Sequence, residues 1–345
     1  MVGTLPRHRL YGLTMASDFP FRNRLAKCAG APDLIFTRVF EAPEEFDPDA
    51  QPPVYASAIR PGDHVPFFRI YALRVGTVDE MLVFNYPDSA DHYLYSDRIV
   101  THLRYPGYDY LVEIQLLGDV LSVWLERRGL IALHASAVVV GDAAIGFLAS
   151  NKGGKTSLAA SLMQAGCPLL TDDILPLEAT EGGVIGHPGF PQMRMWPEVA
   201  AHFLGDWSDT EIVHPAFTKR RIPVGPQGLG SFHDRPVPLA RLFVPEMIDD
   251  DSQQVEMEPL STREVLAQLL GNSFAAGWID ALGWQHRRLN VLARTASMVP
   301  VLRLRYPRGM DRLPQVRQAI LDSCTQPSGA GQQVASSGFQ ATGQQ

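Results

Sequence analysis

The sequence predicts an α/β fold with an α+β tendency, for two reasons. Residues 1–110 alternate short apolar runs with turns rich in Pro, Gly and Asp, a pattern typical of short strands. Residues 130–178 instead alternate strand-like and helix-like patterns around a glycine-rich turn. With 46% hydrophobic residues, the 345-residue chain can bury the core of one large or two moderate domains.

Composition narrows the environment and the partners of the protein. A formal net charge of −7 provides no general attraction to nucleic acid or to anionic lipid. The three cysteines, Cys28, Cys167 and Cys324, match no metal-binding spacing, and their odd number argues against a disulfide framework. We therefore expect a cytoplasmic protein that binds neither nucleic acid nor membrane.

No segment has the pattern of a membrane anchor or a secretion signal. The first residues are basic but lead into no continuous apolar stretch. Residues 129–150 form the most apolar long window, yet His134, Ser136 and Asp142 interrupt it. Because Gly141-Asp142 is typical of a tight hairpin turn, two buried strands are the better interpretation.

The expected elements follow the hydrophobic pattern along the chain. Residues 110–129 have helical periodicity and end on basic residues before Gly129, which suits a helix C-terminus. Ser261 and Glu264 have capping-box spacing at the start of a later helix. The full expectation is strands over 34–40, 65–75, 81–86, 130–140, 143–150, 167–178, 241–246 and 299–307, and helices over 110–129, 155–166, 261–271, 274–295 and 311–324.

These patterns divide the chain into three regions. Residues 1–110 form a small strand-rich region, which we expect to contribute to substrate recognition. Residues 111–324 form the main domain. Residues 325–345 carry almost no charge and few apolar side chains, which predicts a disordered tail.

The stretch ASNKGGKTS, residues 149–157, is close to the phosphate-binding pattern G-x4-G-K-[ST]. In such a loop, free backbone N–H groups and the dipole of the following helix bind phosphate oxygens. Lys155 would reach the β- and γ-phosphates of ATP, and the Thr156 hydroxyl would bind Mg²⁺. A glycine turn with a surface lysine is the alternative, which the flanking strand and helix disfavour. The predicted nucleotide-binding residues are Ser150, Asn151, Lys152, Gly153, Gly154, Lys155, Thr156 and Ser157.

Only Ala149 departs from that pattern, by one methyl group in place of the first glycine. Alanine fits there if its φ is negative, but costs about 1 kcal/mol or more if the turn needs a positive φ. The affinity for nucleotide is open at this point.

Asp172 and Asp173 follow at the end of the next predicted strand. Because neighbouring strand residues point to opposite faces, the two carboxylates should have different roles. One could bind Mg²⁺ through water, and the other could accept a proton from an attacking hydroxyl. A polar strand end that opens a turn is the alternative.

The roles of His134 and of the basic run at residues 219–221 each have two possible interpretations. His134 lies in an apolar strand, where a histidine is either a hydrogen-bonded core residue or, beside the aspartates, a group that orients or tunes one of them. The run of Lys219, Arg220 and Arg221 could neutralise phosphate charge, although a solvated basic turn is the preferred interpretation.

Together these motifs resemble the kinase domain of HPr kinase/phosphorylase and, more closely, the related kinases associated with lasso-peptide biosynthesis. LHASAVVV, ASNKGGKTS and AGCPLLTDD follow in the order and spacing of that family across residues 130–177. Weaker similarity extends through HPGFPQMRMWPE and RPVPLARLFVPE, and YGLTMASDFPF resembles the start of the lasso-associated kinases. The resemblance implies a P-loop kinase core of HPr kinase type behind a small strand-rich N-terminal region.

The resemblance also implies roles for the motif residues. Lys155 would bind phosphate, and Thr156 would assist the metal. Asp173 would be the base that activates the acceptor hydroxyl. His134 would lie beside this base, and Asp172 would support the site and the metal.

Two further roles are implied outside those motifs. Glu198 would be a metal-binding glutamate. The arginine that stabilises the transferred phosphate in the family would correspond to Arg235 or Arg241, with Arg241 as the candidate.

The resulting hypothesis is an ATP-dependent, Mg²⁺-requiring kinase that phosphorylates a serine hydroxyl of a ribosomal peptide precursor, as in lasso-peptide tailoring. Its partner would be a peptide or protein carrying that serine, and a homo-oligomer is open because HPr kinases form rings. One alternative is a kinase acting on a carrier protein, a sugar or another small molecule. Another is a sensor or scaffold that binds ATP and transfers nothing.

Overall fold

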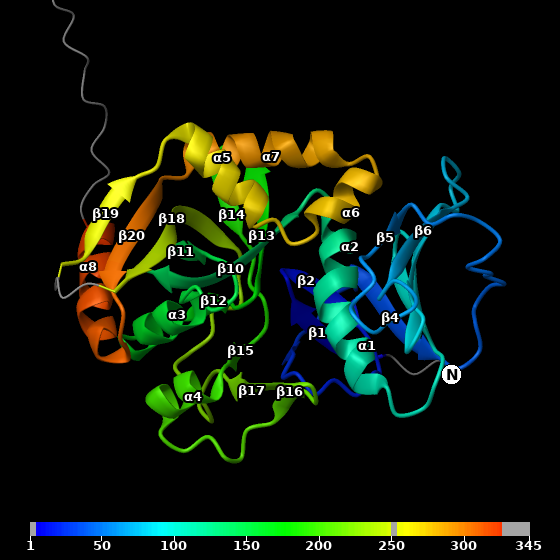
Figure 1. Ribbon diagram of the computed structural model, residues 1–345, viewed down its shortest axis with the longest axis horizontal. Coiled ribbons are helices and arrows are strands. Elements are labelled where there is room, and N and C mark those ends of the chain that lie inside the picture. Colours follow the sequence, from blue (N-terminus) through cyan, green and yellow to red (C-terminus); the bar gives the residue numbers. More distant parts are fainter. Residues whose placement is uncertain (1–4, 250–253, 326–345) are drawn as a thin grey trace, which may run out of the picture.

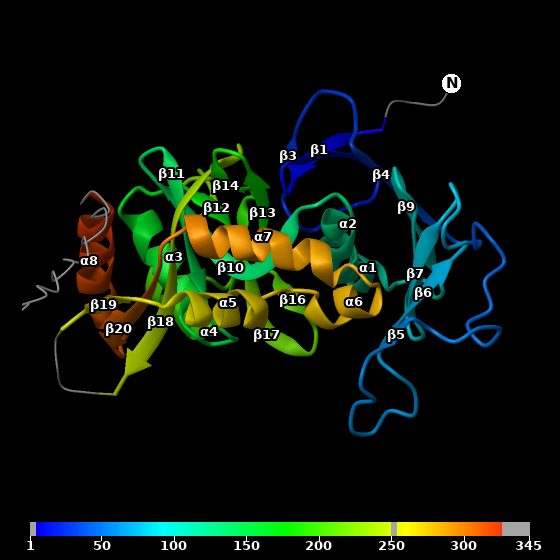
Figure 2. The same ribbon diagram turned by 90° about the horizontal axis from the view of Figure 1, so that it is seen from above.

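The computed structural model describes residues 5–249 and 254–325 and has a mixed α/β architecture with two large sheets (Figure 1). One sheet is built from residues 7–103, and the other from residues 131–307. A helical segment, residues 109–127, lies between them (Figures 1 and 2). The predicted α/β class is therefore confirmed. Apart from Thr325, the predicted disordered tail lies outside the described residues.

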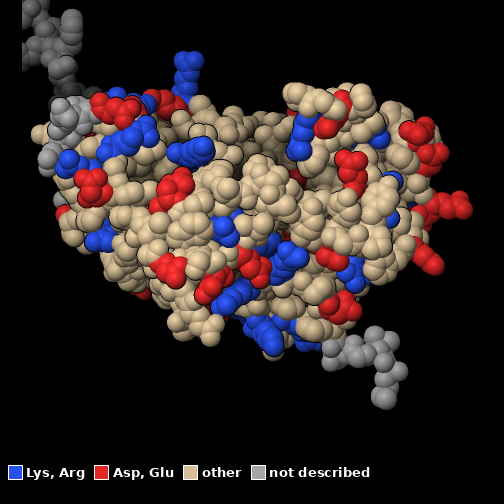
Figure 3. All heavy atoms as spheres, turned by 60° about the horizontal axis from the view of Figure 1, so that its bottom comes forward, with Lys and Arg blue, Asp and Glu red and all other residues tan. Residues whose placement is uncertain are grey.

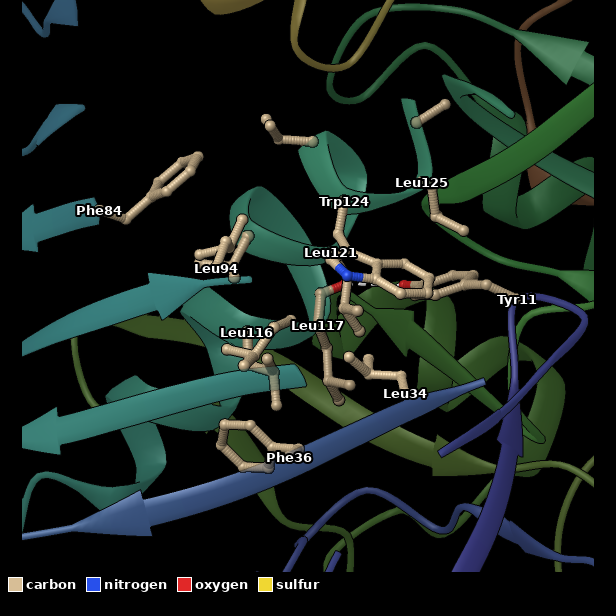
Figure 4. Packing of buried hydrophobic residues seen from close by; sticks show 14 of the residues in the cluster. Tyr11, Leu34, Phe36, Phe84, Leu94, Leu116, Leu117, Leu121, Trp124 and Leu125 are labelled. Carbon is tan, nitrogen blue, oxygen red and sulfur yellow. Dashed lines mark hydrogen bonds between the residues drawn. The ribbon is translucent and has the colours of Figure 1, made fainter. Parts of the chain in front are cut away.

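The N-terminal sheet has nine strands in the order β3-β1-β2-β4-β9-β8-β7-β6-β5. Most neighbours are antiparallel, whereas β4 runs parallel to both β2 and β9. One face packs on the helical segment through an apolar cluster that includes Phe36, Phe84, Leu121 and Trp124 (Figure 4). The strands are β1 (Arg7–Leu10), β2 (Leu13–Ala16), β3 (Ala26–Lys27), β4 (Leu34–Val39), β5 (Tyr55–Ala56), β6 (Arg69–Leu73), β7 (Met81–Tyr86), β8 (Ala90–Leu94) and β9 (Arg98–Leu103).

The second sheet has eight strands in the order β11-β10-β13-β14-β18-β20-β19, with β12 paired to β10. The long strand β18 pairs with β14 at its start, with β11 in its middle and with β20 at its end, so the sheet closes partly on itself. Its strands are β10 (Ile131–Val140), β11 (Ala143–Leu148), β12 (Leu169–Thr171), β13 (Ile174–Thr180), β14 (Gly183–Gly186), β18 (Val237–Ile248), β19 (Glu256–Pro259) and β20 (Val301–Pro307). A small third sheet contains β15 (Gln192–Met195), β16 (Ile212–His214) and β17 (Phe217–Pro223).

Helices cover both faces of the second sheet, with α5 and α7 above it and α3 below it in Figure 1. Side chains of α3, α4 and α8 share one apolar cluster, and those of α5 and α7 share another. The helices are α3 (Lys155–Gln164), α4 (Pro197–Leu204), α5 (Thr262–Gly271), α6 (Ala276–Ala281), α7 (Gln285–Met298), η2 (Met310–Arg312) and α8 (Leu313–Thr325). Among the helices of the described residues, none combines the length and the apolar character needed to span a bilayer.

Most of the expected elements in this half are confirmed, but one strand and one helix are not continuous. The helix expected over residues 274–295 is split into α6 and α7, with Gly283 at a φ of 73° between them. The capping box forms as predicted, because Ser261 and Glu264 exchange side-chain and backbone hydrogen bonds at the start of α5. The expected strand over residues 167–178 is broken, since Asp172 and Asp173 separate β12 from β13. Asp173 has a φ of 72°, which a strand cannot accommodate.

The helical segment comprises α1 (Asp109–Gln115), a π-helical turn η1 (Leu116–Val120) and α2 (Leu121–Arg127). The helix predicted over residues 110–129 is thus confirmed, except for its π turn. Two buried ion pairs fasten the segment to the second half of the molecule. They join Glu113 to Arg221, at 3.4 Å, and Glu126 to the fully buried Arg288.

A buried histidine fastens the same segment to the N-terminal sheet. His92 on β8 is fully buried, with Nδ1 2.8 Å from Thr101 Oγ1 and Nε2 3.0 Å from Gln115 Oε1. Burial lowers the pKa of His92 from 6.5 to about 4. Between pH 6.5 and about pH 4, His92 is protonated in the unfolded chain but neutral in the folded protein. The neutral ring therefore stabilises the fold above pH 6.5, and this contribution is lost toward pH 4.

We expect the variant His92→Gln to lose this acid sensitivity. The pKa difference corresponds to about 3 kcal/mol of unfolding free energy. Urea unfolding of wild type and variant should therefore give a stability difference that shrinks by about this amount between neutral pH and about pH 4. His64→Gln, at an exposed histidine, is the matched control. A stability difference that is constant with pH would show that His92 does not titrate in this way.

Candidate active site

The β10–β11 hairpin directs a six-residue turn, residues 149–154, toward the start of α3. β11 ends at Leu148 and α3 begins at Lys155. Ala149, at the position where glycine was expected, is not among the described non-glycine residues with positive φ. Those residues are Tyr11, Arg74, Lys152 and Asp173. The departure from the glycine pattern therefore causes no backbone strain at Ala149.

Two glycines in the turn leave room that a side chain would fill. A Cβ on Gly153 would lie 2.5 Å from the Cβ of Ala149, so the missing side chain of Gly153 accommodates the alanine methyl. Gly154 has a φ of 88°, and a Cβ there would lie 2.6 Å from Tyr306 Oη. The glycine pair thus lets the turn fold tightly against β20.

Lys155 holds the turn from within. Its side chain is buried, and its Nζ donates hydrogen bonds to the backbone oxygens of Ala149 and Ser150. Burial lowers the pKa of the ammonium group, and the nearby carboxylates of Asp172 and Asp173 oppose that effect. The lysine and the free N–H groups at the start of α3 converge on the turn, an arrangement that binds phosphate oxygens.

Asp172 is a buried acceptor with three donors. Its Oδ1 accepts from Ser136 Oγ at 2.5 Å and from Thr156 Oγ1 at 3.2 Å, and its Oδ2 accepts from the Arg194 backbone N–H at 2.9 Å. Burial and the neighbouring Asp173 raise the pKa of Asp172. This carboxylate therefore joins β10, α3 and β15 beneath the loop.

Asp173 has a different setting from its neighbour. Its Oδ2 lies 3.2 Å from Nη1 of Arg194. Burial alone would raise the pKa of Asp173, but the charges of Arg194, Lys219 and other nearby cations lower it below its usual value. The two acids therefore differ in contacts and in proton affinity. The physical reason is the strand break, and the left-handed φ of Asp173, rather than strand alternation.

The glycine-rich turn, Lys155 and Asp173 line one cavity of about 310 Å³. All eight predicted nucleotide-binding residues, 150–157, contribute to it, and so do His134 and Asp173. The cations in its wall outnumber the carboxylates. The cations are Lys152, Lys155, Arg194, Lys219 and Arg308, and the carboxylates are Asp173 and Glu198. Outside the cavity, basic and acidic side chains are intermingled on the face that is lowest in Figure 1 (Figure 3).

His134 lies at this cavity rather than in the sealed core. It is half-buried on β10, and its ring meets Phe274 edge-on with centroids 6.2 Å apart. Burial, with a smaller contribution from Lys155, lowers its pKa. The His134 imidazole is therefore neutral. The negative charge of the nearby Asp173 opposes this effect, because it raises the pKa of His134.

Two predicted arginines lie elsewhere. Arg241 donates from Nη1 to the O and Oγ of Ser323, at 2.7 and 3.0 Å, which holds it against α8. Arg235 is largely exposed beside Asp234. The fold brings Arg194 and Arg308 to the cavity instead, and β15 places Arg194 beside both acids.

The basic run on β17 is not a solvated turn, so that interpretation is corrected. Arg221 is buried in its ion pair with Glu113. Lys219 lines the cavity, with Nζ 5.4 Å from the centre of the Trp196 ring. Because β17 pairs with β15, Lys219 comes to the same side of the site as Arg194.

The residues available for a metal are oxygen donors at the base of the loop. Thr156 Oγ1 and Asp172 Oδ1 are in contact, and hard oxygen donors beside phosphate suit Mg²⁺. Glu198 lines the cavity from the first turn of α4. Within residues 5–249 and 254–325, no three His, Cys, Asp or Glu side chains gather into a metal-binding group. A divalent ion would therefore depend on Thr156, Asp172 and the phosphates themselves.

Sequence reasoning missed Arg194 and Tyr306. Arg194 stands in the stretch MRMWPE, where only Glu198 was singled out. Arg194 lies four positions before Glu198, the suspected metal ligand, and no motif in the sequence pointed to Arg194 itself. Tyr306 reaches the turn from β20, more than 150 residues along the chain, and no local pattern could have linked it to Gly154.

Comparisons with known proteins add a distant structural likeness. No protein-family model and no curated protein matches the chain. Among solved structures, it is similar to the HPr(Ser) kinase/phosphatase from Coxiella burnetii, with 14% sequence identity and a TM-score of 0.28. The match covers 56% of this chain and 95% of the other. At that identity and TM-score the likeness does not decide the chemistry, which rests on the residues of the site.

Proposed function

We propose that the protein is an ATP-dependent, Mg²⁺-requiring kinase that transfers the terminal phosphoryl group of ATP to a serine hydroxyl. The observation that supports this most is the meeting, in one cavity, of the glycine-rich turn with Asp173 and Arg194. The excess of lining cations suits a polyphosphate. The apolar part of the wall, with Met247, Tyr306 and Leu313, suits a flat base.

Each residue has a role in the transfer. Lys155 and the N–H groups of the turn would bind the phosphate oxygens. Asp173 would accept the proton of the acceptor hydroxyl as its oxygen bonds to the γ-phosphorus and the bond to the β-phosphate oxygen breaks, releasing ADP. Because Arg194 and Lys219 keep Asp173 ionised, it would take the proton late, once bond formation has acidified the hydroxyl.

Thr156 and Asp172 would hold Mg²⁺, which neutralises phosphate charge when bound. The Ser136 hydroxyl holds Oδ1 of Asp172, and the Arg194 backbone N–H holds Oδ2. Such support by a second layer of donors is what positions a metal ligand.

The acceptor that we propose is a ribosomally made peptide precursor of the lasso type, which rests on the resemblance of residues 130–177. A carrier protein, a sugar or another small molecule would use the same chemistry. Calorimetry with ATP and Mg²⁺, followed by transfer assays with γ-labelled ATP and precursor peptides, tests the proposal. ATP binding with no transfer to any acceptor would favour a nucleotide sensor, and no ATP binding would refute the kinase.

A further inference from the structure

A second cavity, of about 270 Å³, adjoins the first. The two share part of their walls, namely His134, Asn151, Asp173, Arg194 and Lys219. Asp173 therefore faces both spaces. A group in the second cavity could approach this carboxylate without entering the first cavity.

The N-terminal half supplies one wall of the second cavity. Tyr11, at the tip of the β1–β2 hairpin, is buried and has a φ of 52°, a costly conformation for a residue with a side chain. Its hydroxyl donates to Leu117 O at 2.7 Å, a contact visible in Figure 4. Its ring meets Phe190 edge-on, and the following Gly12 N–H donates to Pro188 O. The hairpin tip is thus anchored on both sides of the cavity.

The π turn supplies a second wall. Leu117 and Gly118, both in η1, line the cavity. Single π turns inside helices are rare and are frequent at functional sites. Gly118 faces open space, because a Cβ added there would meet only Phe274 Cζ, at 4.0 Å. The absent side chain of Gly118 therefore helps to set the room available.

Charge in the second cavity is balanced. Its carboxylates are Asp172 and Asp173, its cations are Arg194 and Lys219, and burial favours the neutral form of His134 by lowering its pKa. The other lining residues are uncharged. An anionic group would meet no excess of positive charge here, whereas a neutral hydroxyl would find the Asp173 carboxylate as a hydrogen-bond acceptor.

We propose that the second cavity is the acceptor pocket, and that it admits a neutral primary alcohol on a slender stem between the N-terminal hairpin tip and the π turn. This inference rests on the proposed function, because it assigns the acceptor side of the same site. A serine side chain of a peptide and a free small alcohol share that chemistry, and separate probes distinguish them.

The test uses variants whose new side chain fills the second cavity, and it measures phosphoryl transfer to three probes. Gly118→Leu and the milder Gly118→Ala are compared with Gly271→Leu, a control at another helical glycine whose Cβ would meet nothing within 4 Å. The probes are N-acetylserine methylamide, glycerol and the anionic N-acetylserine, each with γ-labelled ATP. We expect Gly118→Leu to lose about 100-fold in transfer to the neutral probes, while its ATP affinity equals that of the control.

Each outcome has a distinct meaning. Transfer to the serine amide alone points to a peptide acceptor, and transfer to glycerol as well points to a free alcohol. Equal transfer to N-acetylserine, or undiminished transfer by Gly118→Leu, overturns the assignment. So does a wild type that binds ATP but phosphorylates neither neutral probe. Failure of ATP binding in the wild type would instead refute the proposed function. If Gly118→Leu does not fold, Gly118→Ala gives the same comparison with a smaller expected loss.

Discussion

The variant Lys155→Ala is expected to lose about 1000-fold in phosphoryl transfer, with ATP binding weakened as well. The ammonium group is the one buried cation inside the turn as the structure describes it, held by the oxygens of Ala149 and Ser150. Removing it takes the lysine donor from both oxygens, although the Ser150 oxygen keeps its hydrogen bond from the Gly153 N–H. The developing phosphate charge also loses its counter-charge. Calorimetry and a labelled-ATP assay measure the two effects separately.

Lys27→Ala is the matched control, because Lys27 lies exposed on the edge strand β3. It should bind ATP and transfer phosphate like the wild type. Transfer by Lys155→Ala at the wild-type rate would show that the phosphate is not bound at this turn.

The variant Asp173→Asn is expected to retain ATP binding and to lose at least about 100-fold in transfer. Asparagine has nearly the same shape but cannot take the hydroxyl proton. Its neutral side chain also frees Arg194 from its ion pair, so ATP should bind as tightly as in the wild type or more tightly. Affinity by calorimetry and rate by labelled ATP give the two quantities.

Asp172→Asn provides the contrast to that variant. Asp172 accepts hydrogen bonds on both oxygens, and asparagine would offer an N–H₂ group in place of one acceptor. We therefore expect Mg²⁺-dependent ATP binding to fall in Asp172→Asn and not in Asp173→Asn. Equal loss of binding in both variants would mean that the two acids share one structural role.

The sequence was sufficient where the pattern is local. The β10–β11 hairpin, the turn at residues 149–154 and the start of α3 follow from a tight Gly-Asp turn, two glycines and helical periodicity. The capping box of Ser261 and Glu264 is equally local, since its two residues are three positions apart.

The sequence was insufficient where distant segments meet. Arg194 reaches Asp173 because β15 folds back across the site, and Tyr11 reaches Leu117 across more than 100 residues. The strand break at Asp172-Asp173 was hidden because both flanking segments are apolar enough for one continuous strand. Arg241 lies in an apolar run on β18, inside the second sheet, but the direction of its side chain, toward Ser323, depends on α8.

The buried ion pairs at the two ends of the helical segment have a mechanical consequence. Moving this segment away from the second half would separate Glu113 from Arg221 and Glu126 from Arg288. A charge that loses its partner while still buried is strongly destabilising. Because one pair lies at each end, tilting the segment about either end still strains the pair at the other end.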